Sequence, residues 1–294
     1  MSILIIGRTG QVARALMERG VGRFDMVALG RPDVDIADGA SLMQAFEAHT
    51  PRLVINASAY TAVDKAESDE AAAFAINAEG VEKLARLCAE AGVPLIHYST
   101  DYVFDGSKDA PYVEADPTAP LGAYGRTKLA GEQAVADVLS DHVILRTAWV
   151  YSPFGGNFVR TMLRLAGERD ELNVVADQHG CPTSALDIAD ATLEIAEKLL
   201  SGAGSFGTYH LCGQGETSWH CLAAEVFAIS AELGGASAKA KPIPSSEYPT
   251  PAARPVNSRL DGSKLARDYG ITLPHWRESV RACVERLIKE GSRA

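Results

Sequence analysis

Short apolar runs alternate with amphipathic stretches along the first half of the chain. Five runs, each bounded by turn-forming or polar residues, predict buried strands at residues 3–6, 26–29, 53–55, 95–97 and 143–145. Apolar positions between them recur at helical spacing, as at residues 81, 84, 85 and 88, and a further helix is expected over 129–138. This alternation indicates parallel strands joined by right-handed crossovers, so we expect an α/β fold with a doubly wound parallel sheet. Ligand sites in such sheets lie at the carboxyl ends of the strands.

The pattern becomes less regular after residue 150. Glycine and proline interrupt it, and segments 201–207 and 245–254 are rich enough in these residues to predict loops without regular structure. Two helices remain clear, at 186–200 and 218–233. We therefore expect residues 151–294 to form mainly a smaller α/β cap, interleaved with the last strands of the sheet.

Composition narrows the class of protein. The chain has 294 residues, 47% of them hydrophobic and 22% charged, which is typical of a water-soluble globular protein and excludes general disorder. Its formal charge of -10 argues against a nucleic-acid partner. The first residues carry no basic leader, and no apolar run approaches the roughly 20 residues that span a bilayer. We expect a cytoplasmic protein with no membrane contact, and the five scattered cysteines predict reduced thiols rather than disulfides or a zinc site.

A glycine-containing turn follows the first predicted strand and opens a helix. Such a turn lets backbone N–H groups approach a pyrophosphate. A turn without a ligand is the alternative, but the strand before and the helix after favour dinucleotide binding. Residues 1–150 would then be a Rossmann domain and 151–294 the substrate-binding part. The candidate cofactor contacts in the turn are Gly7, Thr9, Gly10, Gln11 and Val12.

The ends of the next two strands bear on the choice of cofactor. Arg31 follows the second strand, where an NAD site usually offers an acid, and a guanidinium there suits a 2′-phosphate, with Arg8 as a helper. Asp33 and Asp35 could instead serve a 2′-hydroxyl, so we expect NADPH and leave NADH open. Small residues after the third strand let the backbone pass close to a cofactor, although tight packing would also explain them. These positions are Ala57, Ser58 and Ala59, followed by Tyr60.

Three further residues suggest reduction of a carbonyl group. Tyr124 and Lys128 lie four positions apart, on one face of a helix, where an ammonium would lower the tyrosine pKa and favour proton donation. This spacing alone arises often by chance. Thr100, at the end of the fourth strand, could hydrogen-bond the same carbonyl oxygen or simply cap the backbone. The three signals in this strand order are far less frequent by accident than any one of them.

The glycine turn, the hydroxyl after the fourth strand and the Tyr-x-x-x-Lys pair together resemble the extended short-chain dehydrogenase/reductase superfamily. Within it, the chain is similar to the dTDP-4-dehydrorhamnose reductases. The segments that carry this likeness are 7–12, 56–67, 99–104, 124–132, 146–151, 157–162, 177–183 and 254–258.

The resemblance implies a reductase that uses NADPH or NADH on the 4-keto group of dTDP-4-dehydro-β-L-rhamnose, the last step of dTDP-L-rhamnose synthesis. It implies catalytic roles for Thr100, Tyr124 and Lys128, the last two also touching the cofactor together with Asp35 and Ile36. The substrate contacts that it implies are Val63, Asp64, Thr100, Asp101, Tyr102, Trp149, Asn157 and Arg254.

Other assignments on the same scaffold remain open. Some relatives dimerise through magnesium held by glutamates, one of them early in the first helix, but alanine stands at that place here (Ala15). We therefore assign no metal ligand and leave a homodimer open. One rival is a nucleotide-sugar epimerase or dehydratase, which oxidises its substrate first and retains NAD. The other is a non-catalytic nucleotide-binding regulatory subunit, against which the complete catalytic set argues.

Overall fold

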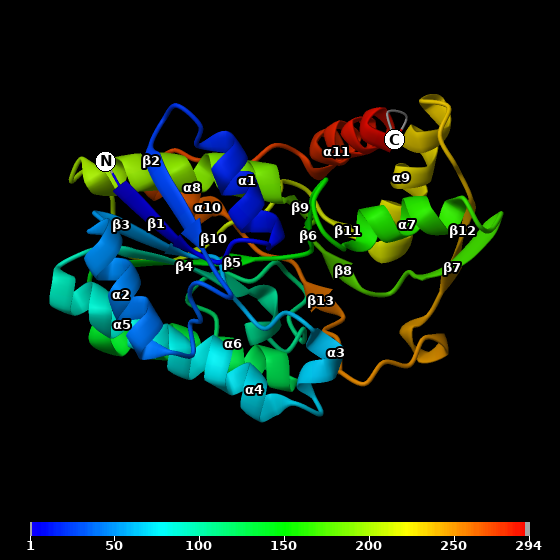
Figure 1. Cartoon of the computed structure of the whole chain (residues 1–294). Coiled ribbons are helices and arrows are strands. Elements are labelled where there is room, and N and C mark those ends of the chain that lie inside the picture. The colour runs from blue at the N-terminus through cyan, green and yellow to red at the C-terminus, as the bar shows by residue number, and fades with distance from the viewer. Residues whose placement is uncertain (1, 292–294) are drawn as a thin grey trace.

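Parallel strands build the central sheet of the protein in the order β10-β5-β4-β3-β1-β2 (Figure 1). The computed structural model describes residues 2–291. The strands of this sheet are β1 (Ser2–Ile6), β2 (Asp25–Leu29), β3 (Leu53–Asn56), β4 (Leu95–Thr100), β5 (His142–Thr147) and β10 (Gly207–His210). The doubly wound parallel sheet expected from the sequence is confirmed, and each of the five predicted runs lies within one of its strands.

Helices cover both faces of the sheet, as Figure 1 shows with α1 and α8 on one side and α2, α5 and α6 on the other. The alternation of side chains along β1 explains this. Ile3 and Ile5 pack toward α1, with Leu16, whereas Leu4 and Ile6 pack toward α5, with Leu84. The helices of this part are α1 (Gln11–Arg19), α2 (Gly39–His49), α3 (Val63–Ala66), α4 (Glu70–Phe74), a π-helical turn (Ala75–Glu79), α5 (Gly80–Ala91), a 3₁₀ turn (Asp101–Val103), α6 (Ala123–Val138) and α8 (Ala185–Leu200).

The strand order reverses direction between β1 and β3. In parallel α/β sheets, ligands bind in the crevice that opens at such a point, beyond the carboxyl ends of the strands. The register brings the ends of neighbouring strands level, with Ile6 beside Asn56 and Thr100 beside Thr147. The segments that follow β1, β3, β4 and β5 therefore meet at one edge of the sheet.

A second lobe lies beyond that edge (Figure 1). Its core joins α7, α9 and α11 through side chains that include Val159, Val226 and Val280. Its elements are β6 (Val150–Tyr151), α7 (Phe158–Ala166), β7 (Glu171–Val175), β8 (His179–Gly180), β9 (Thr183–Ser184), β11 (Thr217–Ser218), α9 (Trp219–Glu232), β12 (Lys239–Ile243), β13 (Asn257–Ser258) and α11 (Trp276–Gly291). Three elements that follow residue 150, namely α8, β10 and α10 (Ser263–Tyr269), pack with the main sheet instead. The division into domains at residue 150 stays a prediction.

The segment 245–254 differs from its predicted structure in one place. It was expected to lack regular structure, but Ser245–Glu247 forms a short 3₁₀ turn after Pro244. Within residues 2–291 no helix combines the length and the hydrophobicity needed to cross a membrane.

Candidate active site

The turn between β1 and α1 requires glycine at Gly7. Its backbone has a φ of 111°, and a Cβ atom there would lie 2.9 Å from the carbonyl group of Ala57. Gly10 precedes α1 as its N-cap, and among the described residues no side chain caps the first turn of this helix. Uncapped N–H groups at a helix N-terminus suit an anionic group such as a pyrophosphate. The backbone of the turn and the N-terminus of α1 thus form a cradle, and the binding of a pyrophosphate in it stays a prediction.

A first cavity of about 340 Å³ opens at this turn. Arg31, Asp35 and Ile36 line it together with Gly7, Thr9 and Gly10. The Arg31 side chain is 68% exposed, with its Nε 3.6 Å from Asp35 Oδ2. Arg8 Nη1 lies 2.6 Å from Asp33 Oδ2. Each guanidinium at this mouth is therefore paired with a carboxylate.

The residues after β3 join this cavity to a second one of about 510 Å³. Gln11 and Val12 line only the second. Ser58 is held in place because its N–H and its hydroxyl both donate to Asn56 Oδ1, at 3.1 and 2.7 Å. Tyr60 is not among the described residues that line either cavity, and its hydroxyl donates to Asp69 at 3.0 Å. The two cavities form one groove, because both are lined by Thr9, Gly10, Ala57, Ser58, Ala59 and Thr61.

Thr100, Tyr124 and Lys128 all line the second cavity, as their positions after β4 and along α6 predicted. Lys128 is buried, and its Nζ donates to the carbonyl oxygen of Tyr98 at 2.6 Å. Burial lowers the pKa of Lys128 to about 8, while the negative charge of Glu132, one helical turn further, opposes that shift. Lys128 is thus still mostly charged at neutral pH.

Tyr124 packs edge-to-face against Tyr102, with ring centroids 5.6 Å apart. Burial raises the pKa of Tyr124, and the charge of Asp101 raises it further, whereas a hydrogen bond from Thr100 lowers it. We expected Lys128 to lower the pKa of Tyr124. In the structure the Lys128 ammonium instead donates to the Tyr98 carbonyl, and Thr100 is the group that opposes the rise in the pKa of Tyr124.

Asp101 follows Thr100 in the chain and is hydrogen-bonded to it. The hydroxyl of Thr100 donates to Asp101 Oδ1 at 2.9 Å and accepts from the Tyr102 N–H at 3.2 Å. Asp101 is only 2% exposed, and no described group hydrogen-bonds its Oδ2. Burial raises the pKa of Asp101 to about 7, against the hydrogen bond from Thr100, which lowers it. The carboxyl is therefore protonated in a large fraction of molecules at neutral pH.

Aromatic side chains form one wall of the second cavity, the active-site cleft. This aromatic wall consists of Tyr102, Trp149 and Trp219, with Val63 also lining the cleft, and Trp149 stacks on Trp219 with ring centroids 3.5 Å apart and 8° between their planes. The indole N–H of Trp149 donates to Ser258 Oγ at 3.0 Å. A flat, partly exposed aromatic surface of this kind suits the apolar face of a sugar ring.

Comparisons with known proteins agree with this geometry. Residues 1–289 match the family model described as the RmlD substrate binding domain. The dTDP-4-dehydrorhamnose reductase of Sinorhizobium fredii is 49% identical, with 100% of both chains covered. The chain belongs to the dTDP-4-dehydrorhamnose reductase family. The family's enzyme from Escherichia coli K12 is 42% identical, with 98% of each chain covered.

Solved structures of the dTDP-4-dehydrorhamnose reductase family share the fold over nearly the whole chain. The enzyme from Clostridium acetobutylicum superimposes with a TM-score of 0.91 at 36% identity, covering 98% of this chain and 100% of that one. The enzyme from Bacillus anthracis, solved in complex with NADP, gives 0.89 at 33% identity, covering 98% and 99%. A UDP-glucose 4-epimerase from Brucella ovis, at 21% identity and a TM-score of 0.81, shares the fold.

Two of the predicted substrate contacts form an ion pair beside the cleft, and neither is among the described residues that line it. Arg254 Nη2 lies 2.9 Å from Asp64 Oδ2, which joins the loop between β12 and β13 to α3. Arg254 also hydrogen-bonds Tyr102, which partly offsets the burial that raises the pKa of Tyr102 to about 12. The pair therefore connects the two lobes next to an aromatic residue of the cleft.

Asn157 has different partners from those expected of a substrate contact. Its Oδ1 accepts from the Arg160 N–H at 3.2 Å, which caps α7, and its Nδ2 donates to Gln11 Oε1 at 3.0 Å and to the Ser152 carbonyl at 2.8 Å. Asn157 is not among the described residues that line the cleft. It ties the second lobe to the glycine turn through Gln11.

Sequence reasoning missed three residues that shape this site. Trp219 stacks on Trp149, and Ser258 accepts a hydrogen bond from the Trp149 indole. In the sequence, Trp219 was an ordinary apolar position of a predicted helix. Ser258 lay in a segment noted only for its resemblance to the family. Asn77, fully buried in the π-helical turn, accepts from the Tyr60 N–H at 2.8 Å and donates to Thr127 on α6 at 3.1 Å. A buried polar residue inside an apolar helical stretch was the available signal.

Across residues 2–291 the structure contains no group of three or more histidine, cysteine, aspartate or glutamate side chains arranged to hold a metal ion. Ala15 in α1, to which we assigned no metal, is fully buried.

Proposed function

We propose that this protein reduces the 4-keto group of dTDP-4-dehydro-β-L-rhamnose to a hydroxyl with NADPH, giving dTDP-L-rhamnose. One observation carries the proposal: Thr100, Tyr124 and Lys128 line the same cleft, and that cleft continues into the cradle at Gly7. The residues present fit a dinucleotide, because the first cavity opens at the Gly7–Gly10 turn and the N-terminus of α1 that follows has no side-chain cap.

Bound NADPH supplies the hydride for C4 of the sugar. Tyr124 donates a proton to the oxygen of the former keto group, because its hydroxyl is protonated at neutral pH. Thr100 hydrogen-bonds the hydroxyl of Tyr124 and stabilises the negative charge that develops there. Lys128, still charged, places a positive group on the same helix face one turn away. Trp149 and Tyr102 hold the sugar ring against these groups.

The remaining assignments follow from the substrate. A sugar nucleotide is a water-soluble metabolite, so we place the reaction in the cytoplasm, with the dTDP-sugar as the partner. Arg31 favours the 2′-phosphate of NADPH, although Asp35 at 3.6 Å competes for its guanidinium and leaves NADH usable. A homodimer without a metal bridge stays a prediction, which sedimentation of the purified protein would test.

The decisive assay follows NADPH oxidation while the keto sugar nucleotide is generated in place by the upstream enzymes. A reductase consumes one NADPH for each dTDP-L-rhamnose formed and releases its oxidised cofactor. An epimerase or dehydratase would change the sugar without net NADPH consumption and would be purified with NAD bound. A regulatory subunit would bind nucleotide and show no turnover. Either of the last two results would refute the proposal.

A further inference from the structure

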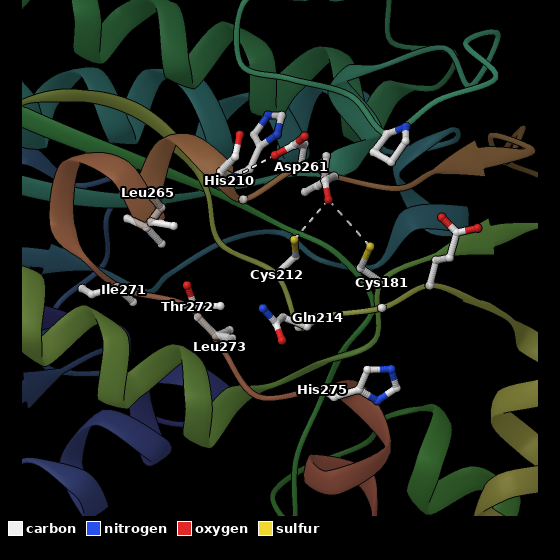
Figure 2. A pocket seen from close by; sticks show the side chains of 18 residues that line it. Cys181, His210, Cys212, Gln214, Asp261, Leu265, Ile271, Thr272, Leu273 and His275 are labelled. Atoms are coloured by element: carbon white, nitrogen blue, oxygen red, sulfur yellow. Dashed lines mark hydrogen bonds between the residues drawn. The ribbon is translucent and has the colours of Figure 1, made fainter.

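A third cavity, of about 560 Å³, lies between β10 and the C-terminal segments (Figure 2). It shares no described lining residue with the active-site groove. Figure 2 shows two thiols, Cys181 and Cys212, pointing to one carbonyl oxygen. That oxygen belongs to Leu260, and the sulfur-to-oxygen distances are 3.9 Å for Cys181 and 3.4 Å for Cys212.

The two thiols influence each other because both approach the same oxygen. The neighbouring Cys212 lowers the pKa of Cys181 despite its burial, and the pKa of Cys212 itself is raised. The segments that directly follow the two cysteines are in contact, because the Gly213 N–H donates to Thr183 Oγ1 at 3.2 Å and a Cβ on Gly213 would lie 2.4 Å from the Pro182 carbonyl oxygen. A disulfide needs Cα atoms closer than about 7 Å, and we infer from these contacts and from the shared Leu260 oxygen that the two cysteines can meet this requirement.

The backbone next to Cys181 supports the aromatic wall of the active site. A Cβ on Gly180 would lie 2.4 Å from Trp149 Cε2, so the indole rests directly on this glycine. Gly180 pairs with Ser258 in the register of β8 and β13, and Ser258 Oγ accepts the indole N–H of Trp149. A shift of the backbone at Cys181 therefore moves the floor and the hydrogen-bond partner of Trp149 together.

We propose that Cys181 and Cys212 are a redox-active pair that a hydroperoxide converts into an intramolecular disulfide, and that this disulfide weakens sugar binding by displacing Trp149. The thiolate of Cys181 attacks the O–O bond of the peroxide, which leaves a sulfenic acid and releases water, or an alcohol from an organic peroxide. The sulfur of Cys212 then attacks the sulfenic sulfur, the S–S bond forms, the S–O bond breaks and water leaves. Two electrons pass from the pair to the peroxide, and both thiol protons end in the released molecules.

The test uses the full-length Cys221→Ser protein, because Cys221 is exposed and would react with peroxide independently. Hydrogen peroxide should remove two hydrogens from the intact mass and yield a cross-linked peptide containing Cys181 and Cys212, which dithiothreitol cleaves. The KM for the keto sugar should rise about tenfold and recover on reduction, since a displacement near 1 Å at an active site can cost up to ~100-fold in rate. The same protein carrying Cys212→Ser should keep the activity of its reduced parent and lose both responses.

Only the kinetic readout rests on the proposed function, so the two failures are distinguishable. A reduced protein with no activity would refute the proposed reductase and leave the cross-link to be judged by mass alone. Absence of the Cys181–Cys212 peptide after peroxide treatment would overturn the redox pair. A complete cross-link with an unchanged KM would overturn its effect on Trp149.

Discussion

The hydroxyl of Thr100 lies 2.9 Å from Oδ1 of the buried Asp101, and the direction of the hydrogen bond between them depends on the ionisation of Asp101. Thr100 has one proton and already accepts from the Tyr102 N–H. When Asp101 is ionised, that proton is committed to the carboxylate. When Asp101 is protonated, the carboxyl donates to Thr100, whose own proton is then free for Tyr124. The neutral acid therefore orients Thr100 for catalysis.

This relationship predicts a pH dependence. The pKa of Asp101 is raised to about 7, so the orienting proton is present below that pH and is lost as the pH rises through it. We expect kcat of the wild type to fall first near pH 7 and again near 8, where Lys128 loses its charge. In Asp101→Asn the side-chain amide can donate to Thr100 at every pH, so the first fall should disappear while the second remains. The measurement is kcat at saturating substrates across this pH range.

Two controls make that result specific. Asp109→Asn, an exposed change in the same segment, should leave the pH profile as in the wild type. Asp101→Ala leaves Thr100 without this donor and should lower kcat at every pH, by about 10²–10³-fold if the group is worth as much as a typical oxyanion donor. An Asp101→Asn protein that still loses activity through pH 7 would exclude Asp101 as the orienting acid.

Tyr124→Phe keeps the ring and its contact with Tyr102 but removes the proton that Tyr124 donates. We expect kcat to fall by about 10²–10⁴-fold, the usual value of a positioned general acid, with NADPH affinity almost unchanged. Single-turnover reduction under saturating NADPH checks this without interference from product release. A near-normal single-turnover rate would remove Tyr124 from the chemistry.

Much of the fold could be predicted because β1, β3 and β5 are buried on both sides and appear as unbroken apolar runs. Thr100, Tyr124 and Lys128 could be found for a related reason: the carboxyl ends of such strands face the ligand site, and helical spacing places two of the three on one face.

The aromatic wall could not be predicted in the same way. Trp219 and Ser258 contact Trp149 across 70 and 109 residues of chain, and no local spacing encodes such a meeting. Tyr60 and Asn157 were assigned from their motifs, but a motif does not say which way a side chain points. Their hydrogen bonds to Asp69 and Gln11 depend on packing that only the folded chain defines.

Arg31→Asp tests the choice of cofactor. The change replaces a guanidinium at the mouth of the first cavity with a second carboxylate beside Asp35. We expect the KM for NADPH to rise more than that for NADH. The ratio of the two KM values should change by a factor that corresponds to about 1–3 kcal/mol, the energy of one hydrogen bond to a charged group. Arg169→Asp, the same charge change at an exposed site after α7, is the matched control. Equal effects of Arg31→Asp on both cofactors would place Arg31 away from the ribose phosphate.

Trp149→Phe tests the sugar-binding wall. Phenylalanine keeps an aromatic face toward Trp219 but loses the hydrogen bond to Ser258 and part of the surface toward the sugar. We expect a higher KM for the keto sugar with little change in kcat, and a loss of stability of only about 1 kcal/mol for the missing hydrogen bond. Steady-state kinetics and urea unfolding separate the two effects. A large loss of stability with an unchanged KM would make Trp149 a core residue.

The buried ion pair behind Lys128 gives a prediction for stability. Arg146 Nη2 lies 2.6 Å from Glu132 Oε2, and both side chains are almost fully buried. Glu132→Gln leaves the guanidinium buried without its counter-charge, so we expect the free energy of unfolding to fall by about 3–5 kcal/mol, measured by urea denaturation. The double variant Glu132→Leu with Arg146→Met removes both charges and should recover most of that loss. Glu70→Gln, a change on α4, breaks an exposed pair with Arg126, which lies on α6 like Glu132, and should have a small effect on the free energy of unfolding.

Because Glu132 raises the pKa of Lys128, Glu132→Gln should also move the alkaline fall of kcat below pH 8. A Glu132→Gln protein as stable as the wild type would mean that water or another group compensates Arg146.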